Sequence, residues 1–131
     1  RFTVRMYAMV GGTGATFDAL CNNHILDYGD HLTVRSVKLY LDGALGSRGA
    51  ALLNEYTDDP GNKGLIRTSV EDFNGVVKQA LDCGYQINTH AIGDRANRVL
   101  LEGYEAAGAT PAGRHRDEHT QIVALEDIPR F

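Results

Sequence analysis

Three side chains that could bind one metal ion, Lys38, His90 and His119, lie at comparable places on three consecutive predicted β-strands. Lys38 and His90 are 52 residues apart, and His90 and His119 are 29 apart. The second spacing matches one strand-plus-helix unit of about 30 residues. Because neighbouring parallel strands lie about 4.8 Å apart, the three side chains could converge. Two imidazoles and an oxygen ligand suit zinc or a similar divalent ion.

Lysine is a poor metal ligand while it is protonated, but a confined lysine can lose its proton. The neutral amine can then react with carbon dioxide to give a carbamate, which offers two anionic oxygens. Each residue also has a plainer interpretation. Lys38 could be a solvated lysine that protects an edge strand from aggregation. His90 could close a turn, and His119 could be a hydrogen-bonded core residue, as we expect for His115.

The elements that must position these residues alternate along the chain. Period-2 patterns predict strands over residues 2–10, 34–42, 85–90 and 114–123. Apolar stripes with capping residues predict helices over 17–28, from the cap Ser69 to Gly84, and over 95–107 behind the cap Asp94. A helix or turn is expected over 125–131. This order predicts a parallel sheet with right-handed crossovers.

The pleat of the strands decides which side chains share a face. Along the second and third strands, one face would carry Ser36, Lys38, Tyr40, Asn88 and His90. A regular pleat in the last strand would place His115, Asp117, His119 and Gln121 together. The connection 43–68 is long and rich in Gly, Asp and Pro, so we expect it to be irregular and to lie over the C-terminal ends of the strands.

Composition bounds the kind of protein. The 131 residues suit one modest domain, and 43% hydrophobic with 23% charged residues indicate a globular chain. A net charge of −4 provides no basic patch for nucleic acid, and no apolar stretch is long enough to span a membrane. Cys21 and Cys83 form neither a Cys-x-x-Cys motif nor a disulfide framework, which leaves the compartment open but favours a reducing, cytoplasmic one.

Four strings of residues carry a resemblance to a known family. They are Val37 to Arg48, Pro60 to Leu65, His90 to Asn97 and Arg114 to His119. Together they resemble the third amidohydrolase family, which includes metal-dependent hydrolases similar to N-substituted formamide deformylase. The resemblance covers nearly the whole chain, although Asp117-Glu118-His119-Thr120 is more polar than the family pattern.

The resemblance implies an α/β fold: a partial (β/α)8 TIM-type barrel with about four parallel strands and intervening helices. Residues 1–131 would be part of one metal-dependent hydrolase barrel domain, truncated at both ends. Lys38 would be the carboxylated bridging lysine, and His90 and His119 the ligands on the two following strands. The family's His-x-His pair and last-strand Asp have no counterpart in the chain.

The resemblance implies that the chain is part of a hydrolase for small amide or formamide substrates. In such an enzyme a metal-activated water attacks the carbonyl, and zinc is the metal we expect. We expect the isolated chain to be inactive. The alternatives are an inert half-barrel with a structural or binding role, and a deaminase of the same superfamily. Arg48 and Asp94 are substrate-side candidates, or else hold loops and cap a helix. The open sheet edges predict a homodimer if the chain exists alone.

Overall fold

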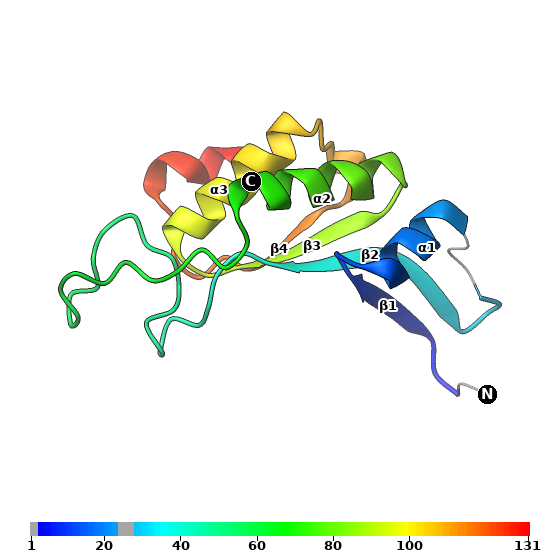
Figure 1. Cartoon of the computed structure of the whole chain (residues 1–131), viewed down its shortest axis with the longest axis horizontal. Helices are drawn as coiled ribbons and strands as arrows, with labels where there is room; N and C mark the ends of the chain where they lie inside the picture. Colours follow the sequence, from blue (N-terminus) through cyan, green and yellow to red (C-terminus); the bar gives the residue numbers. More distant parts are fainter. Residues whose placement is uncertain (1–2, 24–27) are drawn as a thin grey trace.

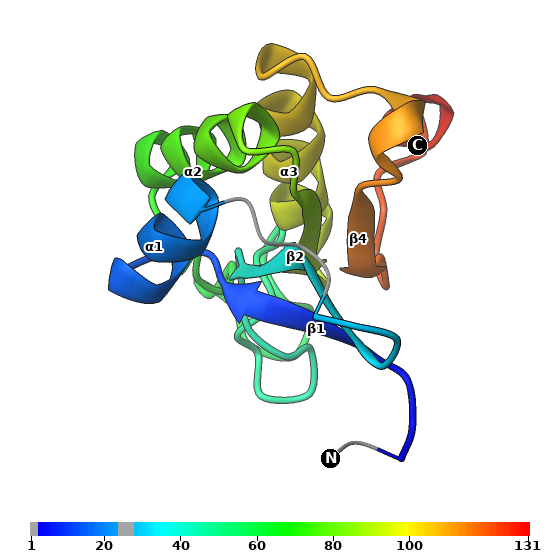
Figure 2. The same ribbon diagram turned by 90° about the vertical axis from the view of Figure 1, so that its right-hand side faces the viewer.

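A four-stranded parallel sheet with helices on one face forms the framework of the protein, described by a computed structural model over residues 3–23 and 28–131 (Figures 1 and 2). The sheet has the order β1-β2-β3-β4, with strands β1 Met6–Gly11, β2 Leu32–Tyr40, β3 Gln86–Ala91 and β4 Arg116–His119. The helices are α1 Ala15–Asn23, α2 Val70–Asp82, α3 Asp94–Ala106 and the 3-10 turns Pro111–Gly113 and Leu125–Arg130. The expected α/β fold with four parallel strands is confirmed.

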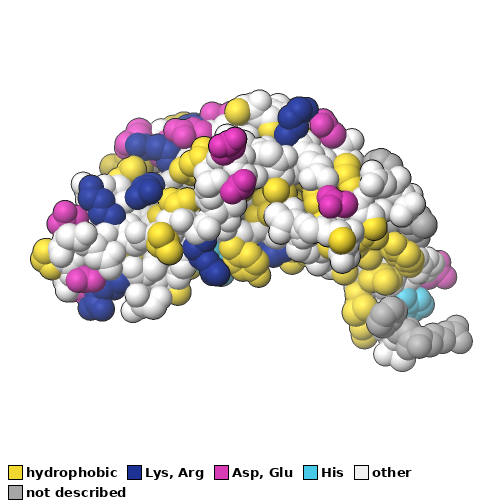
Figure 3. All heavy atoms as spheres, viewed as in Figure 1, with side chains coloured by type: hydrophobic (Ala, Val, Ile, Leu, Met, Phe, Trp, Pro, Cys, Tyr) yellow, Lys and Arg dark blue, Asp and Glu magenta, His cyan; other side chains and the backbone are white. Residues whose placement is uncertain are grey.

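The core lies between the sheet and the helices. In β2, Val37 and Leu39 face α2 and α3 and are buried, together with Phe73, Val77 and Leu100 from those helices. The alternate residues of β2 therefore point to the other face, where Lys38 pairs in register with Asn88 and Tyr40 with His90. This second face is the concave underside of an arched molecule (Figure 3).

Helix α2 begins and ends as its sequence predicts. The Ser69 hydroxyl accepts a hydrogen bond from the Asp72 backbone N–H at 3.1 Å, and it donates to the Asp72 carboxylate at 2.7 Å. These contacts satisfy one of the backbone donors that every helix start leaves without an intrahelical partner. Gly84 follows the helix with φ 74°, a left-handed conformation that glycine adopts without steric cost.

Two predicted elements near the N-terminus are shorter than expected. Strand β1 begins at Met6, because its first partner in β2 is Leu32, and among the described residues no strand lies beside residues 3–5. Phe2, His24 and Ile25 lie outside the described residues. Tyr28, predicted as helical, instead donates its backbone N–H to the Leu32 carbonyl in a turn that leads into β2.

The last strand also differs from its prediction. β4 covers only Arg116–His119, because His119 and Thr120 adopt positive φ angles of 91° and 45° that break the pleat. The prediction that His115, Asp117, His119 and Gln121 share one face of a regular strand is therefore wrong. The 3-10 turn Leu125–Arg130 follows, as expected.

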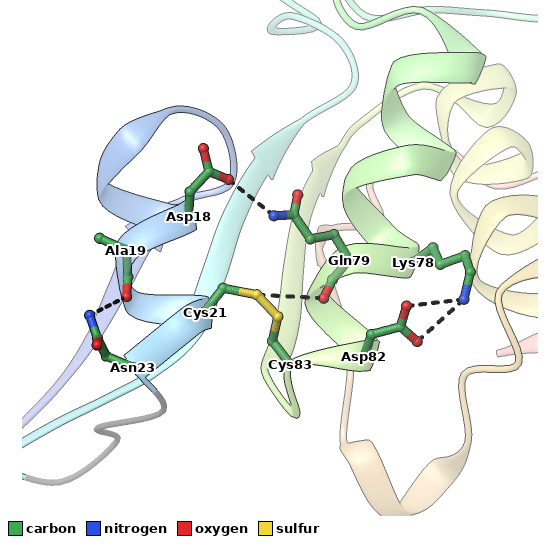
Figure 4. Close-up of a disulfide and its surroundings, with 8 residues drawn as sticks. All are labelled: Asp18, Ala19, Cys21, Asn23, Lys78, Gln79, Asp82 and Cys83. Atoms are coloured by element: carbon green, nitrogen blue, oxygen red, sulfur yellow. Dashed lines mark hydrogen bonds and ion pairs between the residues drawn. A yellow bond between two sulfur atoms is a disulfide. The ribbon is translucent and has the colours of Figure 1, made fainter.

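A disulfide between Cys21 and Cys83 joins α1 to the C-terminal end of α2 (Figure 4). The Cα atoms are 5.4 Å apart, and the Gln79 amide donates to Asp18 alongside. The spacing of the two cysteines did not predict this pairing, because 62 residues separate them and only the packing of α1 on α2 brings them together. Such a bond typically contributes about 2–4 kcal/mol of stability.

The helices of the described residues are short. Within residues 3–23 and 28–131, none of them has the length and apolar character needed to cross a bilayer.

Candidate metal centre

Two histidine rings meet at the C-terminal ends of β3 and β4. The ring centroids of His90 and His119 are 4.6 Å apart, in an edge-to-face arrangement. In register His119 pairs with Ala91, whose side chain is buried in the core on the helix side of the sheet. The positive φ of His119 changes the direction of its side chain at the strand end, which accounts for the contact with His90.

Lys38 lies on the same face of the sheet as His90, and the Tyr40 ring contacts both side chains. Its Nζ is 4.3 Å from the centroid of the Tyr40 ring and donates to the Leu39 carbonyl at 3.2 Å. The Tyr40 and His90 rings are in turn 5.7 Å apart. Burial lowers the pKa of Lys38, while the nearby carboxylates of Glu118 and Asp117 oppose that shift. A lowered pKa increases the fraction of neutral amine, the form that reacts with carbon dioxide.

The imidazole of His90 faces a buried carboxylate. Its Nε2 lies 3.2 Å from Oδ1 of Asp42, without an aligned hydrogen bond. Burial lowers the pKa of His90; Asp42 raises it, and His119 adds to the lowering. The ring is therefore held toward its neutral form, which is the form that binds metal.

Asp42 is the residue of this site that sequence reasoning missed. Its side chain is fully buried, and its two oxygens accept backbone N–H bonds from Ile92 at 3.0 Å, Ala51 at 2.9 Å and Gly93 at 2.8 Å. A buried carboxylate needs such partners because desolvation of its charge is costly. The available signal was an acidic residue directly after an apolar strand, within the string Val37 to Arg48.

The connection 43–68 is irregular, as predicted, apart from one isolated bridge between Tyr56 and Asp59. It follows the C-terminal end of β2 and packs its segment 50–53 against the turn between β3 and α3. The Ala51 carbonyl accepts from the backbone N–H of Arg95 at 3.1 Å. A Cβ atom added at Gly93 would collide with that carbonyl, so the close approach requires glycine.

Asp94 holds this loop. Its Oδ1 accepts the backbone N–H of Leu53 at 2.8 Å and of Arg95 at 2.9 Å. The residue that caps α3 is Gly93, and Asp94 is the first residue of the helix, so the predicted cap is displaced by one position. The reason is that the carbonyl of Ala51 supplies the cap that a side chain would otherwise provide.

Arg48 also holds the loop rather than reaching the histidines. Its guanidinium binds Asp58 through Nη2 at 2.9 Å and Nε at 3.3 Å, and both side chains are largely exposed. This geometry matches the alternative in which Arg48 stabilises the loop through an ion pair. A substrate-side role for Arg48 or Asp94 stays a prediction.

Asp117 differs from every other acidic side chain near the site. Both of its carboxylate oxygens are buried and have no hydrogen-bond partner in the described part of the chain. Burial raises its pKa to about 7, the nearby Thr120 hydroxyl opposes this shift, and the charges of Asp42 and Glu118 add to it. By register it pairs with Thr89, on the helix side of the sheet.

The donor types suit a divalent ion in their chemistry: two imidazoles in contact, one with a lowered pKa, and a lysine whose pKa is lowered. Among the described residues no group of three or more His, Cys, Asp and Glu side chains is arranged to hold a metal. Lys38 would therefore have to supply the third ligand from this chain. The ligand roles of Lys38, His90 and His119 stay predictions.

Comparisons with known proteins show the family of the chain. A sequence model of the amidohydrolase family matches residues 4–131. The Arabidopsis thaliana protein LONG AFTER FAR-RED 3 is 38% identical over 103 residues, which are 76% of this chain and 18% of that protein.

Two solved structures are similar over nearly the whole chain. Both are described as uncharacterized metal-dependent hydrolases. The one from Pyrococcus furiosus has a TM-score of 0.88 and 30% identity, and covers 99% of this chain and 27% of its own. The one from Pyrococcus horikoshii has a TM-score of 0.87 and 31% identity, with 98% and 26% covered. The chain thus spans about a quarter of each, which is consistent with part of a TIM-type barrel.

Proposed function

The chain belongs to the amidohydrolase family, and on that premise we propose that it contributes part of the metal site of a hydrolase acting on amide or formamide C–N bonds. The observation that carries the proposal is the contact between the His90 and His119 rings, 4.6 Å apart at the ends of adjacent parallel strands. This is the end of the sheet at which barrel enzymes place their active sites.

Each residue has a distinct role in this proposal. His90 and His119 donate ring nitrogens, and Lys38 donates carbamate oxygens. In carbamate formation the neutral Nζ attacks carbon dioxide, an N–C bond forms, and one proton leaves to solvent. A divalent ion held by these residues would supply a more acidic bound water, and zinc is our first candidate because it prefers such ligands.

The site also has to keep its ligands in place before the ion arrives. Asp42 and the segment 50–53 tie β2, the loop and the β3–α3 turn into one rigid unit behind His90. Rigid placement of ligands reduces the cost of binding, because little freedom is lost when the ion binds. The packing at this end of the sheet thus supports a binding role more than a purely structural one.

The test is zinc stoichiometry and amide hydrolysis of the protein in its natural full length, because residues 1–131 alone are expected to be inactive. We expect about one or two zinc ions per chain with hydrolysis of an N-formyl or N-acyl amine. His90→Asn and His119→Asn should lose the metal, while the exposed control His31→Asn should keep it. A wild-type protein with neither zinc nor turnover would support the inert alternative. Ammonia release from an amino-substituted ring, without amide hydrolysis, would identify a deaminase instead.

A further inference from the structure

We infer that the pocket at the N-terminal end of the sheet binds a small molecule by its oxyanion group, a phosphate or a carboxylate, through the guanidinium groups of Arg35 and Arg114. The pocket has a volume of about 460 Å³. Small-molecule sites typically have volumes of about 300–1,000 Å³. The pocket is lined by Gln86, the first residue of β3, whereas His90 lies near the other end of that strand. The inference therefore does not depend on the proposed metal site.

The two arginines bring positive charge to this pocket. Both line it, and neither side chain has an ion-pair or hydrogen-bond partner within the described part of the chain. The carboxylate of Asp82, which also lines the pocket, is already bound by Lys78 at 3.0 Å. A guanidinium presents its N–H groups as a planar fork that matches the oxygens of a phosphate or carboxylate. An anionic group is therefore the ligand chemistry that suits the pocket.

A local break in regular backbone geometry places each arginine. The register between β1 and β2 shifts between Ala8 and Met9, which leaves Arg35 as the extra residue of a β-bulge. Bulges change the direction of a side chain and are common beside functional sites. Arg114 has φ 50°, a left-handed conformation that is uncommon and costly for residues other than glycine. Two such departures at one pocket favour a binding role over two ordinary solvated arginines.

Hydrogen bonds hold the backbone that carries Arg114 in place. The side-chain amide of Gln86 donates to the Arg114 carbonyl, and its oxygen accepts the Tyr7 hydroxyl at 3.0 Å. The next residue is also fixed, because the His115 ring accepts the Ile87 backbone N–H at 3.1 Å. These contacts join β1, β3 and the segment before β4 around the pocket. Little backbone freedom would be lost when a ligand binds, which reduces the cost of binding.

Calorimetric titration of the natural full-length protein with inorganic phosphate, and in parallel with succinate, tests the inference. We expect saturable binding of at least one of them, and the tighter ligand identifies the class of oxyanion. A divalent ion can itself bind an oxyanion, so the titration is repeated with His90→Asn, or with chelator-treated wild type if that variant does not fold. We expect unchanged affinity there. Binding of neither anion, or loss of binding in this metal-free protein, would overturn the inference.

Variants of the two arginines then locate the site. Arg35→Gln and Arg114→Asn should each weaken the affinity by about 10- to 100-fold, the range for loss of a hydrogen bond to a charged group. Asparagine tolerates the left-handed conformation, so Arg114→Asn removes the guanidinium without adding backbone strain. The matched control is Arg5→Gln, which changes an exposed arginine that does not line the pocket. We expect that control to bind the anion as the wild type does.

The variants separate a specific site from general attraction by positive charge. Wild-type affinity in both Arg35→Gln and Arg114→Asn would overturn the inference, and so would an equal loss in Arg5→Gln. If Arg35→Gln does not fold, Arg114→Asn decides. If the wild type binds no zinc and hydrolyses no amide, the proposed function fails, while anion binding at the N-terminal end of the sheet is still confirmed or refuted by these titrations.

Discussion

Two aspartates with buried carboxylate oxygens, Asp42 after β2 and Asp117 in β4, differ in the hydrogen-bond donors around them. Asp42 is fully buried, yet three backbone N–H groups bind its oxygens. Asp117 has two buried oxygens and, within the described residues, no donor for either. Asp42 lies where β2, β3 and the long loop all meet, whereas Asp117 lies on the last strand of the sheet order.

The difference shows that burial alone does not define the role of a carboxylate. The same chemical group stabilises one region because the backbone donors around it are already in place, and destabilises the other because desolvation of its charge outweighs the opposing effects of Thr120 and Lys38. Substitutions at the two positions should therefore change stability in opposite directions. Four predictions test or refine this contrast, from the largest effect to the smallest.

Removing the Asp42 carboxylate should have the largest effect. Asp42→Ala leaves three buried N–H groups without an acceptor, each at a cost of about 1–3 kcal/mol. We expect the free energy of unfolding to fall by about 4 kcal/mol, measured by urea denaturation. A loss below about 1 kcal/mol, within the range of an ordinary surface change, would mean that water replaces the carboxylate and that the contrast is wrong.

Changing the loop contact beside Asp42 should have the next largest effect. Gly93→Ala adds a methyl group where the Ala51 carbonyl already lies, and overpacking of this kind costs about 1–3 kcal/mol. The control is Gly75→Ala, because Gly75 is exposed in α2 with open space around it. That control should gain up to about 1 kcal/mol from helix propensity. Thermal unfolding of both variants would show opposite shifts.

Neutralising Asp117 should have a smaller effect of opposite sign. Asp117→Asn keeps the shape of the side chain but removes the desolvated charge, so we expect the protein to become about 1 kcal/mol more stable at pH 8, roughly the scale of one buried polar group. Denaturant unfolding would measure this change as a shift of the midpoint, provided that both proteins show the same dependence of unfolding free energy on denaturant concentration. A destabilised variant would show that the carboxylate has a partner in solution.

His115 extends the contrast to the opposite end of the sheet, with the smallest effect. Its Nδ1 accepts the Ile87 backbone N–H at 3.1 Å, so only the neutral ring makes this bond, and burial lowers the pKa of His115. A lowered folded-state pKa means that the unfolded state binds the proton more readily. Stability from this residue is therefore present above the unfolded pKa of about 6.5 and is lost as the pH falls.

The size of that pH effect is about one hydrogen bond, near 1 kcal/mol, and partial exposure reduces it. Stability curves of the wild type and His115→Gln between pH 5 and pH 8 isolate it, since His90 titrates in both proteins. The wild type should lose more stability at low pH than the variant. Parallel curves would show that the bond to Ile87 survives protonation.

The sequence predicted the framework because strands and helices leave periodic apolar patterns. Val37 and Leu39 alternate with Ser36 and Lys38, and Ser69 with Asp72 marks the start of α2. Those local patterns placed Lys38 and His90 on one face, as the register of β2 and β3 shows.

The parts that escaped prediction depend on contacts between distant segments. Asp42 gains its donors from residues 9 to 51 positions away, and Cys21 meets Cys83 only through helix packing. His119 was assigned to a regular pleat because nothing local signals its positive φ, although that angle is what turns its ring toward His90. Local periodicity carries no information about such contacts.

The large sequence distance between Asp42 and two of its donors has a consequence for folding during synthesis. Its donor at Ala51 is 9 residues downstream, but those at Ile92 and Gly93 are 50 and 51 residues downstream. At a translation rate of about 5–20 residues per second, roughly 2–8 s pass between synthesis of the first donor and synthesis of the last two. Because burial of a carboxylate without its donors is costly, we expect Asp42 to stay in water during that interval and the loop to close over β2 only after β3 has been synthesised.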